Sequence, residues 1–378
     1  MVVKIGGSII SPLGNSVDSV YEALARGESS LRSRKLWNLE EPFVGSMMNW
    51  EEEGPADGLT RFESLSLRSA LVALQEAGID GKRDDVAFVF STTKGNIEQL
   101  GHKFDTTRTQ VRHKFERRLN LGEGARRVVR ELGNGNDPVV VSNACTSGLC
   151  AQIVAQRMLE QKSCRYAVVV GCDVLTEFIV SGFQSFKALS PEGCRPFDAE
   201  RKGLNLGEAA AAMVLTLSDE ASGRWVLERG AIRNDANHIS GPSRTGEGSY
   251  RALRTVLAGV GMEELAFVNA HGTATMYNDE MESIALERAG ITDVPVNSLK
   301  GYLGHTMGAA GVLECLVSMK AVEEGVVLPT RGFGKKGVSG NIKINGELTT
   351  TDRPSFVKML SGFGGCNAVM LYRKGGGV

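Results

Sequence analysis

The chain has 378 residues, of which 43 are Lys or Arg and 44 are Asp or Glu, so its net charge is close to zero. This balance gives no global electrostatic reason to bind nucleic acid or a membrane surface. The length predicts two domains or one large two-part globule, and 46 glycines favour tight turns and close backbone approaches. The N-terminal residues lack a signal-peptide pattern and no apolar run approaches about 18 residues, so we expect a cytoplasmic protein without membrane contact.

Apolar runs alternate with helical patterns along the chain, and Val-rich runs of this kind are typical of strands buried on both faces in a layered α/β protein. In the first half we expect strands at 2–10, 84–92, 137–144, 165–173 and 208–217, and helices at 15–27 and 146–161. The second half repeats this style at 265–275, in a helix beginning near Asn278, and at 294–322 and 357–373. We place the seam between two comparable halves near 217–225.

The segment from 102 to 130 has an unusual local charge. Nine Lys or Arg residues there are accompanied by only Asp105, Glu116 and Glu123, a local net charge of about +6 by residue counting. The segment is either a solvated pair of helices or a docking surface for an acidic partner.

The seven cysteines form an odd set without a CxxC pair, which argues against a disulfide framework or a thiolate zinc site and predicts free thiols. The glycine-rich stretches at 133–137 and 362–367 match neither GxxxxGK[ST] nor GxGxxG. Nothing in the sequence therefore supports a nucleotide cofactor.

Cys145 lies between an expected strand and an expected helix, among small residues. Unpaired N–H groups and the helix dipole favour a thiolate at such a position, which predicts a pKa below that of free cysteine. The backbone N–H groups of the same turn could stabilise a thioester oxyanion. A buried core cysteine is the alternative, because free cysteine is among the most buried residue types.

Two of the five histidines, His271 and His305, follow apolar runs and precede small residues. Each alone is explained by a core imidazole, but together with Cys145 they favour function, because small neighbours leave room for a substrate and two imidazoles supply paired hydrogen-bond donors. A Cys/His/His zinc site is the chemical rival. The three residues lack ligand-pair spacing and a fourth ligand, so we expect no metal.

On these residues the chain resembles the β-ketoacyl-acyl carrier protein synthases, specifically the elongating class with a Cys-His-His triad. The likeness spans nearly the whole chain and keeps the order of the motifs. These motifs are ACTSG around Cys145, HGTAT from His271, LKGYLGHTMGAAGVLE with Lys300 and His305, and GFGGCN at 362–367.

The resemblance implies a thiolase-like α/β fold, a five-layer αβαβα arrangement of two similar halves. Residues 1–220 would form the half with the nucleophilic cysteine, and residues 221–378 the half with both histidines. Family members usually dimerise, which implies either a homodimer or a heterodimer with a paralogous synthase or chain-length factor.

The resemblance also implies a decarboxylative Claisen condensation by an acyltransferase in fatty acid, polyketide or aryl-polyene synthesis. Cys145 would take an acyl chain from the phosphopantetheine of an acyl carrier protein, with oxyanion donors from the backbone amides of Cys145 and Phe363. His271 and His305 would stabilise the enolate formed from malonyl-carrier protein. No other cofactor is implied, and Phe363 resembles the residue that gates the acyl pocket, although an ordinary packed aromatic is the alternative.

Further residues match the family motifs. Lys300 would act through hydrogen bonding and positive potential together with Glu314, the alternative being a surface salt bridge. Asp279 would support the site. Thr273 and Thr275 resemble the hydroxyls that contact pantetheine, although Thr in a turn often bonds its own backbone.

The match to the family's docking surface for the acidic carrier protein is only regional. The candidate docking residues are Arg117, Arg118, Arg126, Arg127 and Lys187. Ala274, Ser361 and Cys366 depart from the common family pattern and alter the pocket and the gate. The sequence therefore leaves open the acyl chain, the pathway, the carrier protein and the dimer partner.

Other functions differ from this pattern in specific residues. Thiolases use a second catalytic cysteine and starter-type synthases a His/Asn pair, whereas this chain presents His271 and His305. A non-catalytic chain-length factor typically lacks the cysteine, which this chain keeps. A Cys/His acyl hydrolase, amidase or protease would hydrolyse its substrate without decarboxylation.

Overall fold

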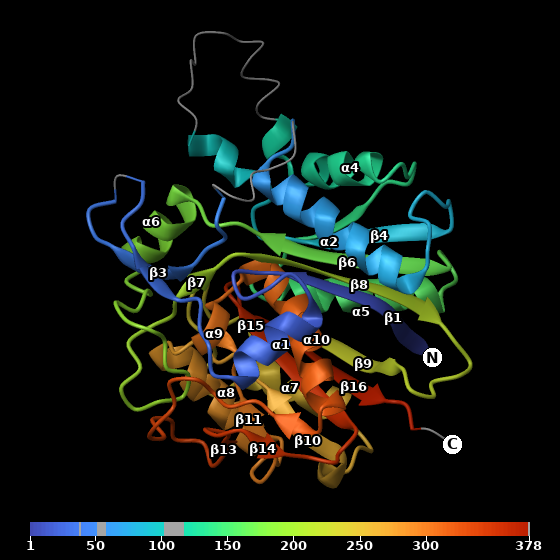
Figure 1. Cartoon of the computed structure of the whole chain (residues 1–378). Helices are drawn as coiled ribbons and strands as arrows, with labels where there is room; N and C mark the ends of the chain where they lie inside the picture. Colours follow the sequence, from blue (N-terminus) through green and yellow to red (C-terminus); the bar gives the residue numbers. More distant parts are fainter. Residues whose placement is uncertain (38, 51–57, 102–116, 377–378) are drawn as a thin grey trace.

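The main feature of the structure is a continuous sheet of eleven strands that is built from two similar halves (Figure 1). The computed structural model describes residues 1–37, 39–50, 58–101 and 117–376. The first half has the order β1 (Val2–Ile10), β8 (Ala209–Leu217), β6 (Tyr166–Asp173), β4 (Val86–Ser91) and β5 (Val139–Val141). The second half has the order β9 (Trp225–Asn234), β16 (Cys366–Lys374), β15 (Ser355–Gly362), β10 (Leu265–Asn269), β11 (Pro295–Asn297) and β13 (Lys343–Ile344).

The two halves share one pattern of strand directions. In the first, β1 with β8 and β8 with β6 are antiparallel, whereas β6 with β4 and β4 with β5 are parallel. In the second, β9 with β16 and β16 with β15 are antiparallel, whereas β15 with β10 and β10 with β11 are parallel. A short antiparallel pairing of β1 with β9 joins the halves. The predicted arrangement of two similar thiolase-like halves is confirmed.

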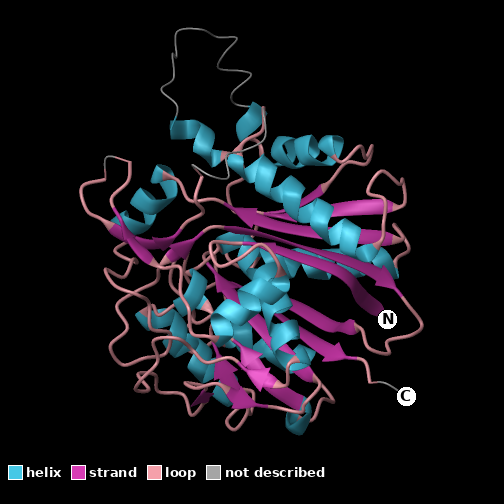
Figure 2. Cartoon of the chain, viewed as in Figure 1, coloured by secondary structure: helices cyan, strands magenta, loops and turns pink. Residues whose placement is uncertain are grey.

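Helices form three layers around and between the halves, so that helix and strand layers alternate (Figure 2). On the outer face of the first half lie α2 (Arg61–Ala77) and α4 (Leu121–Glu131). Between the halves lie α1 (Val17–Ala25), α5 (Ser147–Glu160) and α10 (Ala310–Glu323). On the outer face of the second half lie α7 (Glu247–Val256) and α8 (Met276–Arg288).

Local sequence explains how these elements begin and pack. The β6 strand is buried on both faces from Ala167 to Asp173, because helices cover both sides of its half of the sheet. The α2 helix begins at a capping box, in which the Thr60 hydroxyl accepts from the Glu63 N–H (3.1 Å) and the Glu63 carboxylate accepts from the Thr60 N–H (3.0 Å). It ends at Gly78, whose φ of 66° is left-handed.

The remaining elements of the described chain are short. A three-stranded sheet, a two-stranded sheet and several short helices belong to this group. They are β2 (Arg32–Arg34), β3 (Phe43–Ser46), β7 (Leu206–Gly207), β12 (Val326–Val327), β14 (Thr349–Thr350), α6 (Glu177–Ser185), α9 (Lys300–Leu303), and the 3₁₀ turns at Ile97–Gly101, Met262–Glu264 and Met307–Ala309.

The strands predicted in the first half coincide with β1, β4, β5, β6 and β8, and the two predicted helices with α1 and α5. The helix expected near Asn278 is α8. The sequence did not predict β9, α2 or α7. The chain passes from the first half to the second between Leu217 and Trp225. Within the described ranges, no helix combines the length and the apolar character that a membrane crossing requires.

Candidate active site

A strained turn between β5 and α5 presents Cys145. Ala144 has a φ of 46°, a left-handed value that non-glycine residues rarely adopt. The Thr146 hydroxyl donates to the Asn143 carbonyl (2.7 Å), and the Ser147 hydroxyl donates to the Ala144 carbonyl (2.6 Å). These bonds hold the turn, so the thiol of Cys145 reaches the cavity described below while α5 begins directly behind it.

His271 follows β10 and is held by a carboxylate of α8. Glu282 accepts hydrogen bonds from the backbone N–H groups of His271 and Gly272, both at 2.7 Å, and from the Asn278 side chain at 2.8 Å. Burial, together with nearby Asp279, raises the pKa of Glu282 to about 7. Glu282 therefore fixes the backbone from which the imidazole projects.

Asp279 holds the next part of the same turn. Its carboxylate accepts from the backbone N–H groups of Thr273 (3.0 Å) and Ala274 (3.1 Å), and burial raises its pKa to about 6. Ala274 has a left-handed φ of 64°. The hydroxyls of Thr273 and Thr275 lie 2.9 Å apart and bond each other, and both residues line the cavity. The turn therefore directs a hydroxyl pair towards the space in front of His271.

His305 follows α9, and its hydrogen bonds indicate which ring nitrogen carries the proton. The Met307 backbone N–H donates to Nδ1 of His305 (3.3 Å), so the neutral ring carries its proton on Nε2. Nε2 is buried and has no hydrogen-bond partner among the described residues. A buried donor without a partner is costly, and its presence here suggests that a substrate oxygen would accept its bond.

The structure brings Cys145, His271 and His305 together. The sulfur and one ring nitrogen of each histidine lie within 4.8 Å of one another, and the two rings meet edge to face with centroids 5.0 Å apart. A tetrahedral zinc site would need a fourth donor, and this group, drawn from the described part of the chain, has three. The absence of a metal remains a prediction.

Both imidazoles are neutral near pH 7. Burial, followed by the positive charge of Lys300, holds the pKa of His271 and of His305 well below the ordinary value. Two neutral rings can donate a hydrogen bond or accept a proton, which suits a site where an oxygen gains negative charge.

The prediction of a lowered pKa for Cys145 is wrong. Burial raises the pKa of its thiol to about 11, although Lys300 and the backbone N–H groups of Phe363 and Cys145 act in the opposite direction. The helix-end position is present as expected, but desolvation outweighs it. The resting residue is therefore a thiol, and it must lose its proton during acyl transfer.

This pKa predicts how the free enzyme reacts with an alkylating agent. The rate of Cys145 modification by iodoacetamide should rise about tenfold for each pH unit between pH 7 and pH 9, because the thiolate fraction rises in that proportion below the pKa. Peptide mass spectrometry of timed samples measures the rate. A rate that stays constant over this range would show that the thiolate is already formed.

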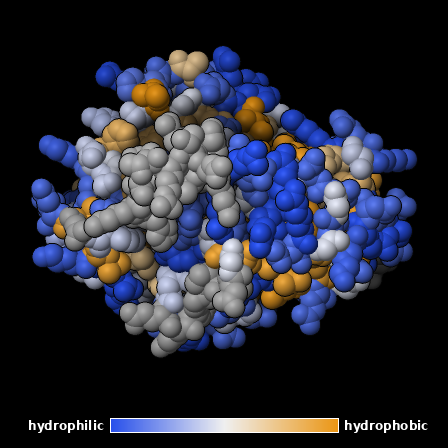
Figure 3. All heavy atoms as spheres, turned by 90° about the horizontal axis from the view of Figure 1, so that it is seen from above, coloured by the Kyte–Doolittle hydropathy of each residue, from blue (hydrophilic) through white to orange (hydrophobic). Residues whose placement is uncertain are grey.

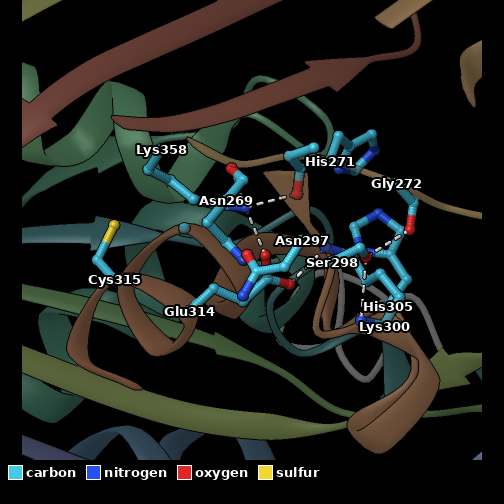
Figure 4. Close-up of polar contacts among 12 residues, drawn as sticks. Asn269, His271, Gly272, Asn297, Ser298, Lys300, His305, Glu314, Cys315 and Lys358 are labelled. Carbon is cyan, nitrogen blue, oxygen red and sulfur yellow. Dashed lines mark hydrogen bonds and ion pairs between the residues drawn. The ribbon is translucent and has the colours of Figure 1, made fainter. Parts of the chain in front are cut away.

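Lys300 and Glu314 form a buried ion pair behind the histidines (Figure 4). Both side chains are almost fully buried, so the alternative of a surface salt bridge is wrong. Burial tends to raise the pKa of Glu314, but Lys300 and Lys358 bring it below its ordinary value. The sequence did not predict Lys358, whose Nζ lies 2.6 Å from Glu314. The sequence feature that could have identified Lys358 is a single lysine within the apolar run FVKML.

A cavity of about 370 Å³ opens in front of these groups. It is lined by Cys145, Phe183, Phe186, Lys187, His271, Thr273, Thr275, His305 and Phe363, among others. The Phe363 side chain is 40% exposed and stacks on Phe183 of α6 with ring centroids 6.0 Å apart, while Phe186 meets it edge-on at 6.0 Å. Phe363 therefore lies in a small aromatic cluster at the mouth, not in a packed core. The sequence did not predict the α6 side of this cluster.

Residues 102–116 of the basic segment lie outside the described residues. Hydrophilic side chains cover much of the face above α2 and α4 (Figure 3). Arg117 and Lys187 are exposed, and Lys187 also lines the cavity. The other three candidate docking residues are paired within the chain: Arg118 with Glu63 (3.2 Å), Arg126 with Glu123 (2.9 Å) and Asp137 (3.0 Å), and Arg127 with Glu131 (2.9 Å). Within the described ranges no ion pair is seen for Arg117 or Lys187, which makes these two the sharper candidates.

Comparisons with known proteins agree with this geometry. The family model of the β-ketoacyl synthase N-terminal domain matches residues 1–221, and that of the C-terminal domain matches residues 226–334. A 3-oxoacyl-[acyl-carrier-protein] synthase 2 of Vibrio cholerae is 27% identical over 99% of both chains.

Solved structures show the same likeness. A β-ketoacyl synthase from Burkholderia phymatum superimposes with a TM-score of 0.88 at 26% identity, covering 99% of each chain. The ishigamide ketosynthase/chain length factor gives a TM-score of 0.84 at 26% identity, again covering 99% of each chain. The chain belongs to the β-ketoacyl synthase family and is an acyltransferase.

Proposed function

We propose that Cys145, His271 and His305 carry out a decarboxylative Claisen condensation between an acyl group held on Cys145 and malonyl-acyl carrier protein. The observation that supports this most strongly is the convergence of the Cys145 sulfur with one ring nitrogen of each histidine, within 4.8 Å, at the cavity. The relatives named 3-oxoacyl-[acyl-carrier-protein] synthase support the same substrate class.

The first step transfers the acyl group. The Cys145 sulfur attacks the carbonyl carbon of the acyl thioester, the bond to the pantetheine sulfur breaks, and the Cys145 proton leaves with the pantetheine thiol. The His271 ring, which is neutral near pH 7 and has one nitrogen lone pair, can relay that proton. The N–H groups of Cys145 and Phe363 point towards this sulfur, and we assign them to the oxyanion.

The second step breaks the bond between the malonyl carboxylate and its α-carbon and releases carbon dioxide. The electron pair passes to the thioester oxygen as an enolate, which accepts from Nε2–H of His305 and from His271. The enolate carbon then attacks the acyl thioester, and the Cys145 thiolate leaves and takes up one proton from solvent, which balances the loss of the malonyl carboxylate as carbon dioxide. A preorganised hydrogen-bond donor in a site without water stabilises such a developing negative charge by about 3–4 kcal/mol.

The residues at the opening of the cavity indicate how the substrates reach Cys145. We assign the hydroxyl pair of Thr273 and Thr275 to the pantetheine arm of an acyl carrier protein, and Phe363 to a gate over Cys145. Asp279, Glu314 and Lys300 support the two imidazoles. The cysteines are all free, which suits a reducing cytoplasm.

We further propose that the protein works as a dimer, either with itself or with a paralogue. The solved ketosynthase/chain length factor supports the second form. In the sheet order β5 is the terminal strand, so its outer edge has no pairing strand among the described residues. An exposed edge of this kind is commonly covered by another chain.

An assay of carbon dioxide release from malonyl-acyl carrier protein tests the proposed function. The protein, supplied with an acyl-carrier protein, should release one carbon dioxide for each 3-oxoacyl product. Hydrolysis of the acyl thioester without carbon dioxide release would instead indicate the acyl hydrolase considered from the sequence.

Reversing the charge of Arg117 and Lys187 tests carrier docking. The double variant R117E/K187E should raise KM for acyl-carrier protein up to about thirtyfold with little change in kcat, because each exposed ion pair contributes up to about 1 kcal/mol. Arg118 is left unchanged, since a carboxylate there would face Glu63. An acyl-pantetheine substrate serves as the control and should keep its KM. An unchanged KM for the carrier protein would remove both residues from the docking surface.

A further inference from the structure

Lys358 is a second buried lysine behind the two histidines. It lies within β15, its side chain is 0% exposed, and its Nζ has three oxygen acceptors. These are a Glu314 carboxylate oxygen at 2.6 Å and the backbone carbonyls of Ala270 at 3.0 Å and Asn269 at 3.3 Å (Figure 4). Its two carbonyl partners are the residues that directly precede His271.

The number of acceptors indicates the protonation state of Lys358. An ammonium group has three N–H donors, one for each of the three oxygens, whereas a neutral amine has two donors and a lone pair that would face an oxygen. Burial lowers the pKa of Lys358 on balance, and the Glu314 carboxylate opposes this shift. The geometry therefore favours the charged form.

The buried cluster then has an unbalanced charge. Lys300 and Lys358 bind different oxygens of the same carboxylate, so two positive charges share the one negative charge of Glu314. The other titratable groups that face Lys358 are Cys315, Glu282, His271 and His305. Lys300 and Glu314 alone would form a neutral pair, and a second buried cation adds a desolvation penalty. The stability of the fold does not account for Lys358.

We propose that Lys358 is a positioning residue for the condensation, fixing the carbonyls that lead to His271 and supplying the unbalanced positive charge behind both imidazoles. That charge favours the negative charge that builds up on the enolate oxygen, and it adds to the burial and the Lys300 charge that keep both rings neutral. The inference rests on the proposed function. Acyl transfer to Cys145 needs this charge less, because its oxyanion is assigned to backbone N–H groups.

The variant K358M removes the charge while keeping a side chain of similar length. Carbon dioxide release should fall by about tenfold or more, while the extent and rate of Cys145 acylation should change by less than about threefold. The acid limb of the pH profile should move to higher pH, because loss of a nearby positive charge raises the pKa of both histidines. Protonation of His305 on Nδ1 would oppose the Met307 N–H and disable the ring.

A matched control is K320M, which removes a lysine at the outer end of α10, where it binds Asp18 and Glu324. This variant should keep the wild-type rates and pH profile. The melting temperature of K358M should fall by only a few degrees at most, because buried acceptors lose their donor while the desolvation penalty of one buried cation is removed. Unfolding of K358M, or a proportional loss of acylation and carbon dioxide release, would overturn the inference by showing a structural role.

A double variant separates charge from contact. E314Q/K358M keeps Lys300 as the only charge of the cluster and so restores its net charge of one, which should return the acid limb towards the wild-type pH. An acid limb that stays where it lies in K358M would overturn the charge explanation. Wild-type protein that releases no carbon dioxide would refute the proposed function itself. Active wild type with an unaltered K358M would refute only the role of Lys358.

Discussion

Replacement of Cys145 by alanine should abolish the acyl-enzyme and lower the condensation rate by at least about 10⁴-fold. The sulfur is the atom that would hold the acyl chain, and no binding interaction replaces a covalent intermediate. Slow release of carbon dioxide from malonyl-carrier protein should persist, because His271 and His305 remain in place. Incubation with an acyl-carrier protein followed by mass spectrometry of tryptic peptides measures the added acyl mass.

The expected peptide contains a second cysteine, which gives the experiment its control. Trypsin cleaves after Arg130 and Arg157, so Cys145 and Cys150 share one peptide. Cys150 is 2% exposed, and the C150A variant should be acylated like the wild type. Acylation that persists in C145A but disappears in C150A would show that Cys150 carries the acyl group, and it would refute the assignment of Cys145.

The sequence predicted most of the first half of the fold, because its strands are continuous apolar runs. β6 and β8 are buried on both faces, so nearly all of their residues are apolar. Such a run can be recognised in the sequence without knowledge of tertiary contacts. β9 was missed for the opposite reason. It has the sequence WVLERGAIRN, and its charged residues are exposed while Trp225 and Leu227 are buried. Only its pairing with β1 and β16 makes it a strand of the sheet.

The candidate site shows the same division between local and long-range information. Cys145, His271 and His305 have small neighbours and stand at the ends of recognisable elements, so their motifs identify them. The raised pKa of Cys145 depends on desolvation by segments distant in sequence, and no local pattern reports it. Lys358 likewise reaches Glu314 across 44 residues and Ala270 across 88.

Replacement of His305 by alanine should separate the two half-reactions. The variant should retain acylation of Cys145, because the backbone donors assigned to that oxyanion are untouched. Carbon dioxide release and condensation should fall by about 10²- to 10³-fold, the usual effect of removing one preorganised donor from a developing oxyanion. Single-turnover measurements of acyl transfer and of carbon dioxide release, made on the same preparation, give both rates.

Two further variants connect this loss to the proton on Nε2. H305Q can place an amide N–H near the Nε2 position and should recover part of the rate, whereas H305A cannot donate at all. H238A removes an exposed histidine that accepts from the Ser240 N–H (3.2 Å), and it should leave both half-reactions at the wild-type rate. Full condensation activity in H305A would refute the role of His305 in decarboxylation. Equal losses of acylation and decarboxylation would instead show that the ring mainly holds the shape of the cavity.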